Sequence, residues 1–484
     1  MKINVDVFLG GTMDYLESLE VKNFGPINEA KINISPLTVF VGKNSSGKSF
    51  LSSLIHSLSN PFKHNIHRFP AYSLNYLLDN NPELLNDFET KLENYLKSEP
   101  SFTDKAFSYP LKEFIRLIDE GFGKCYTKSI ENELKNNWKT NLNHLNRMNQ
   151  YPFEIKYDEI TFVNDNGKLV SYNFSNKIKN FFKTINFINP IGVKISTDEN
   201  KLYINFDYSL WMKMYGDDES ISIGQLIYVL VVNKLIKELQ NNSFYIPVGG
   251  EIFKDFNAFM VNEVKGVIDS STIEKEFLTN LLKVNEATSE GYFYNLACEL
   301  ENDINKGEIQ IKNGELKDEI VFIDEKNNIE FDLNLISSSV HELIPIIIYL
   351  KYYLNKGDIL ILEEIENHLH PENQLILVKY LVKALNQGLN IILTTHSDYI
   401  LEKFNNLIQL GNCKKEVFTH LNYDESCILD YRDISIYNFK KNDDYSYTPH
   451  MIDVNFTGFS EDNFSHVIDE LYNESDIMDE FKIR

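Results

Sequence analysis

Three short segments of the chain carry residue types that bind and cleave phosphate esters. They are, in chain order, Gly42–Ser49, the pair Glu363-Glu364, and Thr394–Ser397. The first is rich in glycine and ends in Lys-Ser, the second places two carboxylates side by side, and the third contains a histidine. This order predicts a protein that binds a nucleotide and hydrolyses it.

The first segment fits the P-loop pattern G-x-x-x-x-G-K-[ST] and lies between an apolar run, 37–41, that predicts a strand and a run, 50–58, that predicts a helix. Backbone N–H groups of such a loop approach the phosphates, Lys48 reaches the β and γ oxygens, and the Ser49 hydroxyl ligates Mg²⁺. The alternative is a glycine turn before a surface helix. We expect ATP and Mg²⁺ as cofactors. The expected nucleotide-binding residues are Gly42, Lys43, Asn44, Ser45, Ser46, Gly47, Lys48, Ser49 and Phe50.

The carboxylate pair follows an apolar run, 359–362, that predicts a buried strand. Ligands of open α/β sheets bind at the carboxyl ends of the strands, so the pair is placed where a nucleotide would lie. We expect Glu363 to hold Mg²⁺, directly or through water, and Glu364 to orient or deprotonate the attacking water. An acidic helix N-terminus is the alternative.

His396 also follows an apolar run, 389–394, which predicts the next buried strand. If the two strands are parallel neighbours, His396 and Glu364 lie at the same sheet edge, where a neutral imidazole can contact the γ-phosphate. A structural histidine is the alternative. The expected catalytic residues are therefore Lys48, Glu364 and His396.

Composition and charge limit the possible function classes. The chain has 484 residues, 43% of them hydrophobic, and a net charge of −24, with nearly all the acidic excess after residue 250. That charge repels nucleic acid, so any DNA contact would have to come from a local patch or from a partner; the acidity serves either solubility or partner docking. No apolar run approaches the roughly 20 residues of a membrane span. Residues 1–12 lack the features of an export signal, and the four cysteines predict neither disulfides nor zinc, so we expect a cytoplasmic protein.

Hydrophobic patterning predicts an α/β fold in which buried parallel strands alternate with helices. Residues 16–41 predict a hairpin that leads into the P-loop, and 151–210 predict two hairpins. The expected organisation is an N-terminal extension, 1–12; the first segment of the ATPase core, 13–57; a helical insertion, 58–150; antiparallel strands and the start of a second helical region, 151–250; a helical region, 251–305; the second segment of the ATPase core, 306–411; and acidic C-terminal strands and helix, 412–484.

These motifs together resemble the ABC-type ATPases of the RecF, SMC and OLD proteins, and in particular the AAA family ATPases related to OLD. The resemblance covers most of the chain. It is carried by Leu19–Ile27, the P-loop, the run Glu363-Glu364-Ile365-Glu366-Asn367-His368-Leu369-His370-Pro371, and Thr395-His396-Ser397. It implies a P-loop NTPase head of ABC type with a mostly parallel sheet, an antiparallel N-lobe sheet and helical insertions.

The resemblance also implies a homodimer or larger homo-oligomer that sandwiches two nucleotides. Residues 336–342 resemble a degenerate ABC signature, so Ser338 and Ser339 of one subunit would contact ATP bound by the other. Asn367 and His368 would occupy the D-loop at the same interface, and His396 resembles the switch histidine. Val340 stands where a signature glycine is frequent, and no arginine follows Tyr245-Ile246-Pro247, so a role for that arginine does not transfer.

Several biological roles are compatible with such an ATPase. The leading hypothesis is a dimer that regulates a separate effector, a nuclease or toxin, in phage defence, because the stretch after His396 lacks the pattern of the nuclease domain of OLD proteins. A DNA-repair or chromosome-maintenance ATPase is the first alternative, with a basic patch at Lys124, Lys128, Lys135 and Lys139 that also suits a solvated helix. A nucleotide-gated scaffold with little turnover is the second.

Overall fold

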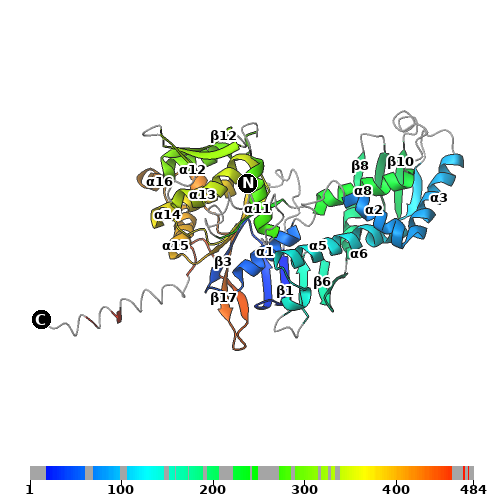
Figure 1. The fold of residues 1–484 in the computed structure, drawn as a ribbon, viewed down its shortest axis with the longest axis horizontal. Helices are drawn as coiled ribbons and strands as arrows, with labels where there is room; N and C mark the ends of the chain where they lie inside the picture. The colour runs from blue at the N-terminus through cyan, green and yellow to red at the C-terminus, as the bar shows by residue number, and fades with distance from the viewer. Residues whose placement is uncertain are drawn as a thin grey trace, which may run out of the picture. The chain divides into compact units, whose positions relative to one another are not determined.

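The computed structural model describes residues 18–59, 69–98, 106–146, 152–157, 160–172, 174–188, 193–206, 222–239, 242–248, 272–284, 289–313, 318–324, 329–332, 338–460, 473–474 and 478. The chain forms two compact units (Figure 1). The first consists of Met1–Gly25 and Ser57–Asn241, and the second of Pro26–His56 and Asn242–Arg484. The expected N-terminal extension and most of the helix expected after residue 460 lie outside the described residues.

A mostly parallel sheet forms the centre of the second unit. Its strand order is β11-β15-β16-β3-β17-β18-β2, and among the described residues its neighbouring strands are parallel except in the β17–β18 hairpin. The prediction of a mostly parallel α/β sheet is therefore confirmed. The strands are β2 (Ile27–Asn33), β3 (Leu37–Gly42), β11 (Ser243–Ile246), β15 (Ile359–Leu362), β16 (Asn390–Thr395), β17 (Ile434–Lys441) and β18 (Tyr447–Ile452).

Burial explains why the central strands are apolar along their whole length. Every residue of β3, β15 and β16 is buried, as expected for strands covered on both faces. The core of the unit combines these strands with apolar side chains from the helices that follow and precede them. Those helices are α11 (Thr272–Lys283), α12 (Tyr294–Asn305), α13 (Ser338–Ile348), α14 (Pro371–Asn386) and α15 (Asp398–Leu410); α1 (Lys48–Ser59) follows the P-loop.

The C-terminal strand β17 pairs with the P-loop strand β3 and thus belongs to the core sheet. Gly42, at the end of β3, lies opposite Phe439 of β17, and a Cβ on Gly42 would come within 3.0 Å of the Phe439 Cβ. The first glycine of the P-loop is therefore required by the neighbouring strand as well as by its φ of +145°.

A separate three-stranded antiparallel sheet also lies in the described part of the second unit. Its strands are β12 (Gly307–Asn313), β13 (Asp318–Asp324) and β14 (Ile329–Asp332). Helix α13 continues into a π-helical turn, Tyr349–Tyr353.

The first unit contains two antiparallel groups of strands. The order β1-β5-β6-β7 includes the expected hairpin, whose Asn166-Gly167 turn has positive φ at both residues. The order β4-β10-β9-β8 includes the second expected hairpin, β9–β10. The strands are β1 (Ser18–Phe24), β4 (Phe107–Pro110), β5 (Glu154–Tyr157), β6 (Ile160–Asp165), β7 (Lys168–Tyr172), β8 (Asn186–Ile188), β9 (Val193–Thr197) and β10 (Lys201–Phe206).

The described part of the first unit also contains helices. They are α2 (Phe69–Asn80), α3 (Pro82–Ser98), α4 (Leu111–Ile118), α5 (Lys124–Asn137), α6 (Phe174–Thr184) and α8 (Ile223–Leu239). One strand, β4, lies in the segment 58–150 whose pattern predicted helices. Phe107 and Tyr109 of β4 are buried and pair with β10, so a partner distant in sequence decides this local structure.

Within the described residues, no helix is long and apolar enough to cross a membrane.

A buried ion pair connects three elements of the second unit. Lys351, in the π-helical turn, lies 2.6 Å from Glu301 of α12, and the two side chains are 1% and 2% exposed. The Lys351 ammonium also donates to the Ile309 carbonyl of β12 at 3.1 Å, and the Ile309 N–H donates to Glu301 at 2.8 Å. Removing one charge would leave the other buried without compensation.

We expect Lys351→Met to lower the free energy of unfolding by about 3–5 kcal/mol, because it leaves the buried Glu301 carboxylate without its cation. Urea unfolding followed by far-UV circular dichroism measures the loss, and hydrogen exchange should locate it in α12 and β12. Lys379→Met is the matched control, since the Lys379–Asp303 pair is partly exposed and should contribute less than about 1 kcal/mol. Equal losses in both variants would contradict the prediction.

Candidate nucleotide-binding and catalytic site

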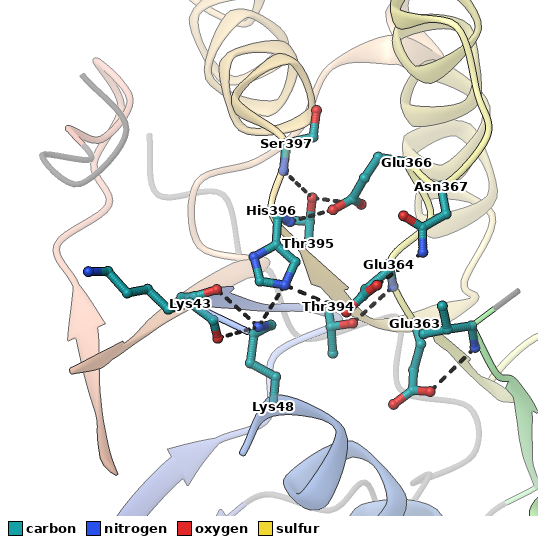
Figure 2. Close-up of polar contacts among 12 residues, drawn as sticks. Lys43, Lys48, Glu363, Glu364, Glu366, Asn367, Thr394, Thr395, His396 and Ser397 are labelled. Carbon is teal, nitrogen blue, oxygen red and sulfur yellow. Dashed lines mark hydrogen bonds and ion pairs between the residues drawn. The ribbon is translucent and has the colours of Figure 1, made fainter. Parts of the chain in front are cut away.

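The carboxyl ends of three neighbouring parallel strands bring the predicted segments together (Figure 2). The P-loop follows β3, Glu363 and Glu364 follow β15, and His396 follows β16, which lies between the other two. The register pairs Leu362 with Leu393 and Thr395 with Val41, so the strands end at nearly the same level. Their loops therefore meet at one sheet edge, the usual ligand position in open α/β sheets.

The P-loop backbone has positive φ values at Ser45 and Gly47. Ser45 has a φ of +61° and Gly47 a φ of +98°. The φ of Gly47 favours glycine, and a Cβ there would come within 2.5 Å of the end of the Ile27 side chain, which would have to move. Ser46 is fully buried, and its hydroxyl has no hydrogen-bond partner within the described structure. This arrangement fits a bound phosphate group.

Lys48, the first residue of α1, carries a buried ammonium group at the centre of the site. Its side chain donates to the carbonyls of Gly42 at 3.0 Å and Lys43 at 3.1 Å, and its Nζ lies 3.0 Å from His396 Nε2 (Figure 2). Burial lowers the pKa of Lys48 to about 8, although the charges of Glu364, Glu366 and Glu363 oppose the shift.

Glu364 is held in a strained conformation by two hydrogen bonds. Its φ of +42° lies in the left-handed region, which costs a non-glycine residue about 1–3 kcal/mol. Its N–H donates to Thr394 Oγ1 at 3.0 Å, and its Oε2 accepts from Asn367 Nδ2 at 3.0 Å. The other oxygen lies 3.6 Å from His396 Nε2. The carboxylate therefore faces both the imidazole and the open edge of the sheet.

His396 lies between the lysine and the carboxylate. Burial lowers the pKa of His396, the Lys48 charge lowers it further, and Glu364 opposes both effects. The ring is therefore neutral at neutral pH. Because the Lys48 ammonium can only donate, Nε2 accepts, and the neutral ring carries its proton on Nδ1.

Glu366 is a site residue to which sequence reasoning gave no role. It accepts hydrogen bonds from the Thr395 hydroxyl, at 3.0 Å, and from the His396 N–H. Burial raises the pKa of its carboxyl group. The Thr395 hydroxyl in turn accepts from the Ser397 N–H at 2.9 Å, so Glu366 fixes the backbone that carries His396. The only signal in the sequence was a third carboxylate close to the predicted pair.

The residues expected to hold magnesium have suitable chemistry. Glu363 is half-buried; one of its oxygens accepts from the Val248 N–H at 3.4 Å, and the other is buried without a hydrogen-bond partner in the described part of the chain. Burial raises the pKa of Glu363, whereas the nearby hydroxyls of Tyr245 and Ser49 lower it. The Glu363 oxygen without a partner lies near the Ser49 hydroxyl, in the first turn of α1. Such a pair of oxygen atoms fits a divalent cation that prefers oxygen ligands.

Four of the remaining predicted residues belong to the P-loop and the start of α1, and the side chains of the other two lie outside the described part of the structure. Lys43, Asn44 and Ser45 are exposed in the P-loop, and Phe50 is half-buried in the first turn of α1. Ser338 and Ser339 begin α13, but their side chains lie outside the described part of the structure.

Comparisons with known proteins agree with the P-loop motif. The profile of the AAA ATPase domain family matches residues 15–401. Comparison with curated protein sequences gives no significant match.

Among solved structures, the chain is similar to three SMC head domains. A head bound to the winged-helix domain of ScpA has 13% identity and a TM-score of 0.36, with 91% of this chain and 98% of that chain covered. The head from Thermotoga maritima has 13% identity and a TM-score of 0.32, covering 91% and 99%. A head with an extended coiled coil, bound to a ScpA domain from Pyrococcus furiosus, has 11% identity and a TM-score of 0.36, covering 95% and 99%.

We expect the imidazole of His396 to titrate below pH 6.5, because burial and the Lys48 charge together outweigh Glu364. In NMR spectra of protein labelled at histidine Cε1, the signal lost in His396→Gln should report this midpoint. Lys48→Met should raise the midpoint, since Glu364 would then act on the ring without the opposing cation. A wild-type midpoint above 6.5 would show that Glu364 dominates.

Proposed function

The chain belongs to the AAA ATPase domain family, and on that premise we propose that it binds ATP with Mg²⁺ and hydrolyses it to ADP and phosphate. One observation carries the proposal. His396 Nε2 lies 3.0 Å from Lys48 Nζ and 3.6 Å from Glu364, so a P-loop cation, an imidazole and a carboxylate from three loops meet at one point. Such convergence suits in-line attack on a γ-phosphate.

The P-loop residues, Gly42–Ser49 with Phe50, form the nucleotide-binding element of this proposal. Backbone N–H groups and Lys48 bind the phosphates, and the buried Ser46 hydroxyl without a partner in the described structure supports this role. Ser49 and Glu363 hold Mg²⁺, which when bound neutralises phosphate charge and orients the γ-phosphate.

Glu364 acts on the attacking water in this proposal. Its carboxylate orients the water and takes its proton while the water oxygen bonds to the γ-phosphorus and the bond to the β–γ bridging oxygen breaks. Asn367 and the Thr394 hydroxyl hold Glu364 in its strained position. Neutral His396 donates or accepts a hydrogen bond near the γ-phosphate and keeps Lys48 directed into the site.

The functional unit in this proposal is an OLD-like nucleotide-sandwich dimer. Ser338 and Ser339 of one subunit contact ATP held by the other, and dimer closure regulates a separate effector protein in phage defence, in the cytoplasm. Support comes from the resemblance of residues 336–342 to an ABC signature and from α13 beginning at Ser338. Exposed His368, next to Asn367, suits a D-loop at the same interface.

The structure gives less support to the DNA-clamping alternative. Two of the four lysines considered as a basic patch, Lys128 and Lys135, both form ion pairs with Glu131, at 2.6 and 2.7 Å. Their charge is therefore partly neutralised within α5, as on an ordinary solvated helix face. The scaffold alternative predicts nucleotide binding without turnover and is an outcome of the test below.

We expect Glu364→Gln to reduce kcat for ATP hydrolysis by about 10²–10⁴-fold, because it removes the proton acceptor while the P-loop still binds nucleotide. Phosphate release measures turnover, and light scattering with ATP present should detect a trapped dimer or larger assembly.

Glu372→Gln is the control, since Glu372 is a largely exposed glutamate in the first turn of α14. It should leave turnover and assembly at wild-type values. If the wild type binds ATP tightly but releases no phosphate, the ATPase proposal is contradicted and the nucleotide-gated scaffold is supported.

A further inference from the structure

Buried polar contacts join helix α1 to strand β11 in the second unit. Tyr245 of β11 is 4% exposed, and its hydroxyl lies 3.0 Å from Ser52 Oγ and 3.1 Å from Ser53 Oγ, both on α1. Helix faces packed on a sheet are normally apolar, because a buried polar group costs free energy unless it is hydrogen-bonded. The contacts of Ser52 and Ser53 with the Tyr245 hydroxyl therefore indicate a role beyond packing.

The same hydroxyl lies beside the carboxylate of Glu363, one of the two residues proposed to hold magnesium. The Tyr245 hydroxyl and the Glu363 carboxylate are close enough to change each other's pKa. On the other side, Ser52 Oγ donates to the carbonyl oxygen of Ser49 at 3.2 Å. Tyr245 thus contacts the segment that carries Ser49 and also borders Glu363.

Ser49 and Glu363 follow strands that are not neighbours in the sheet. Strand β16 lies between β3 and β15, so no shared hydrogen-bond ladder fixes the separation of the two side chains. Strand β11 holds Glu363 from the far side of β15: the Glu363 N–H donates to the Ile246 carbonyl at 3.1 Å, and Val248 donates to its carboxylate at 3.4 Å. A contact from β11 to α1 therefore links both sides of the site.

Farther along the helix, a second contact joins α1 to β11, and another joins it to α11. His56 is fully buried; its Nδ1 lies 2.8 Å from Ser243 Oγ and its Nε2 lies 3.1 Å from Glu276 of α11. Ser243 and Tyr245 are alternate residues of one strand and share a face of the sheet. The helix is thus attached to the strand at two levels, which restrains the Tyr245 hydroxyl relative to α1.

We propose that Tyr245 is a positioning residue for the magnesium site, whose hydroxyl sets the distance between the first turn of α1, with Ser49, and Glu363. The proposal rests on the ATPase function proposed above. A merely structural tyrosine would affect stability and leave cation affinity unchanged, whereas a positioning tyrosine affects cation affinity itself.

Tyr245→Phe keeps the aromatic ring and removes only the hydroxyl. With Mn²⁺ as the probe cation and ATP present, electron paramagnetic resonance of free Mn²⁺ should give a Kd about 10–100-fold higher than for the wild type. ATP affinity measured in EDTA should stay at the wild-type value, because the P-loop is unchanged. The double variant Ser52→Ala with Ser53→Ala removes the same contact from α1 and should also raise the Kd for Mn²⁺.

Tyr349→Phe is the matched control. Tyr349 is fully buried in the same unit, and its hydroxyl accepts from Asn280 at 3.4 Å, away from Glu363. Unchanged Mn²⁺ affinity in Tyr245→Phe, or equal weakening in Tyr349→Phe, would overturn the proposal. A wild type that does not bind Mn²⁺ with ATP would overturn the ATPase proposal together with this one. A wild type that binds without turnover overturns hydrolysis alone, because this test measures cation binding.

Discussion

The buried ammonium group of Lys48 is the interaction on which the site depends. A cation removed from water is stable only if nearby groups replace its hydration, and here two P-loop carbonyls and the His396 imidazole do so. The lysine therefore needs the loop after β3 and the loop after β16 at the same time. Burial nevertheless lowers the pKa of Lys48 to about 8, so these three groups do not fully replace the hydration of the ammonium group. The ammonium group therefore remains suited to bind an anion.

Parallel register explains how residues far apart in sequence reach this cation. Strands β15, β16 and β3 are short, fully buried and aligned, so their carboxyl ends need only short loops to meet. The loop after β15 turns at once, which forces Glu364 into a left-handed conformation. The Thr394 hydroxyl, from the adjacent strand, binds the Glu364 N–H and so offsets some of that strain. The hydrogen bonds from Thr394 and Asn367 therefore keep the Glu364 carboxylate beside His396 despite the strain.

Sequence reasoning could predict the features of this design that depend on local pattern. Apolar runs before the P-loop, Glu363 and His396 predicted β3, β15 and β16, and chain order predicted their common edge. The pairing of β17 with β3 was not predictable, because an apolar strand does not reveal its neighbour. Glu366 and Tyr245 were not assigned for a similar reason: their partners, Thr395 and the α1 serines, come from other strands and helices. The described backbone shows where α13 begins, while the roles of Ser338 and Ser339 stay predictions.

Charge balance connects the magnesium site to nucleotide affinity. Glu363, Glu364 and Glu366 surround one lysine and a neutral histidine, so the site carries more negative than positive charge. Burial raises the pKa of Glu363 and Glu366, which shows that their ionised forms are already costly there. A triphosphate adds further negative charge, so its binding depends strongly on a divalent cation. If Ser49 and Glu363 hold the cation as proposed, their separation matters for phosphate affinity as well as for chemistry, and the proposed role of the buried contact between α1 and β11 extends to both.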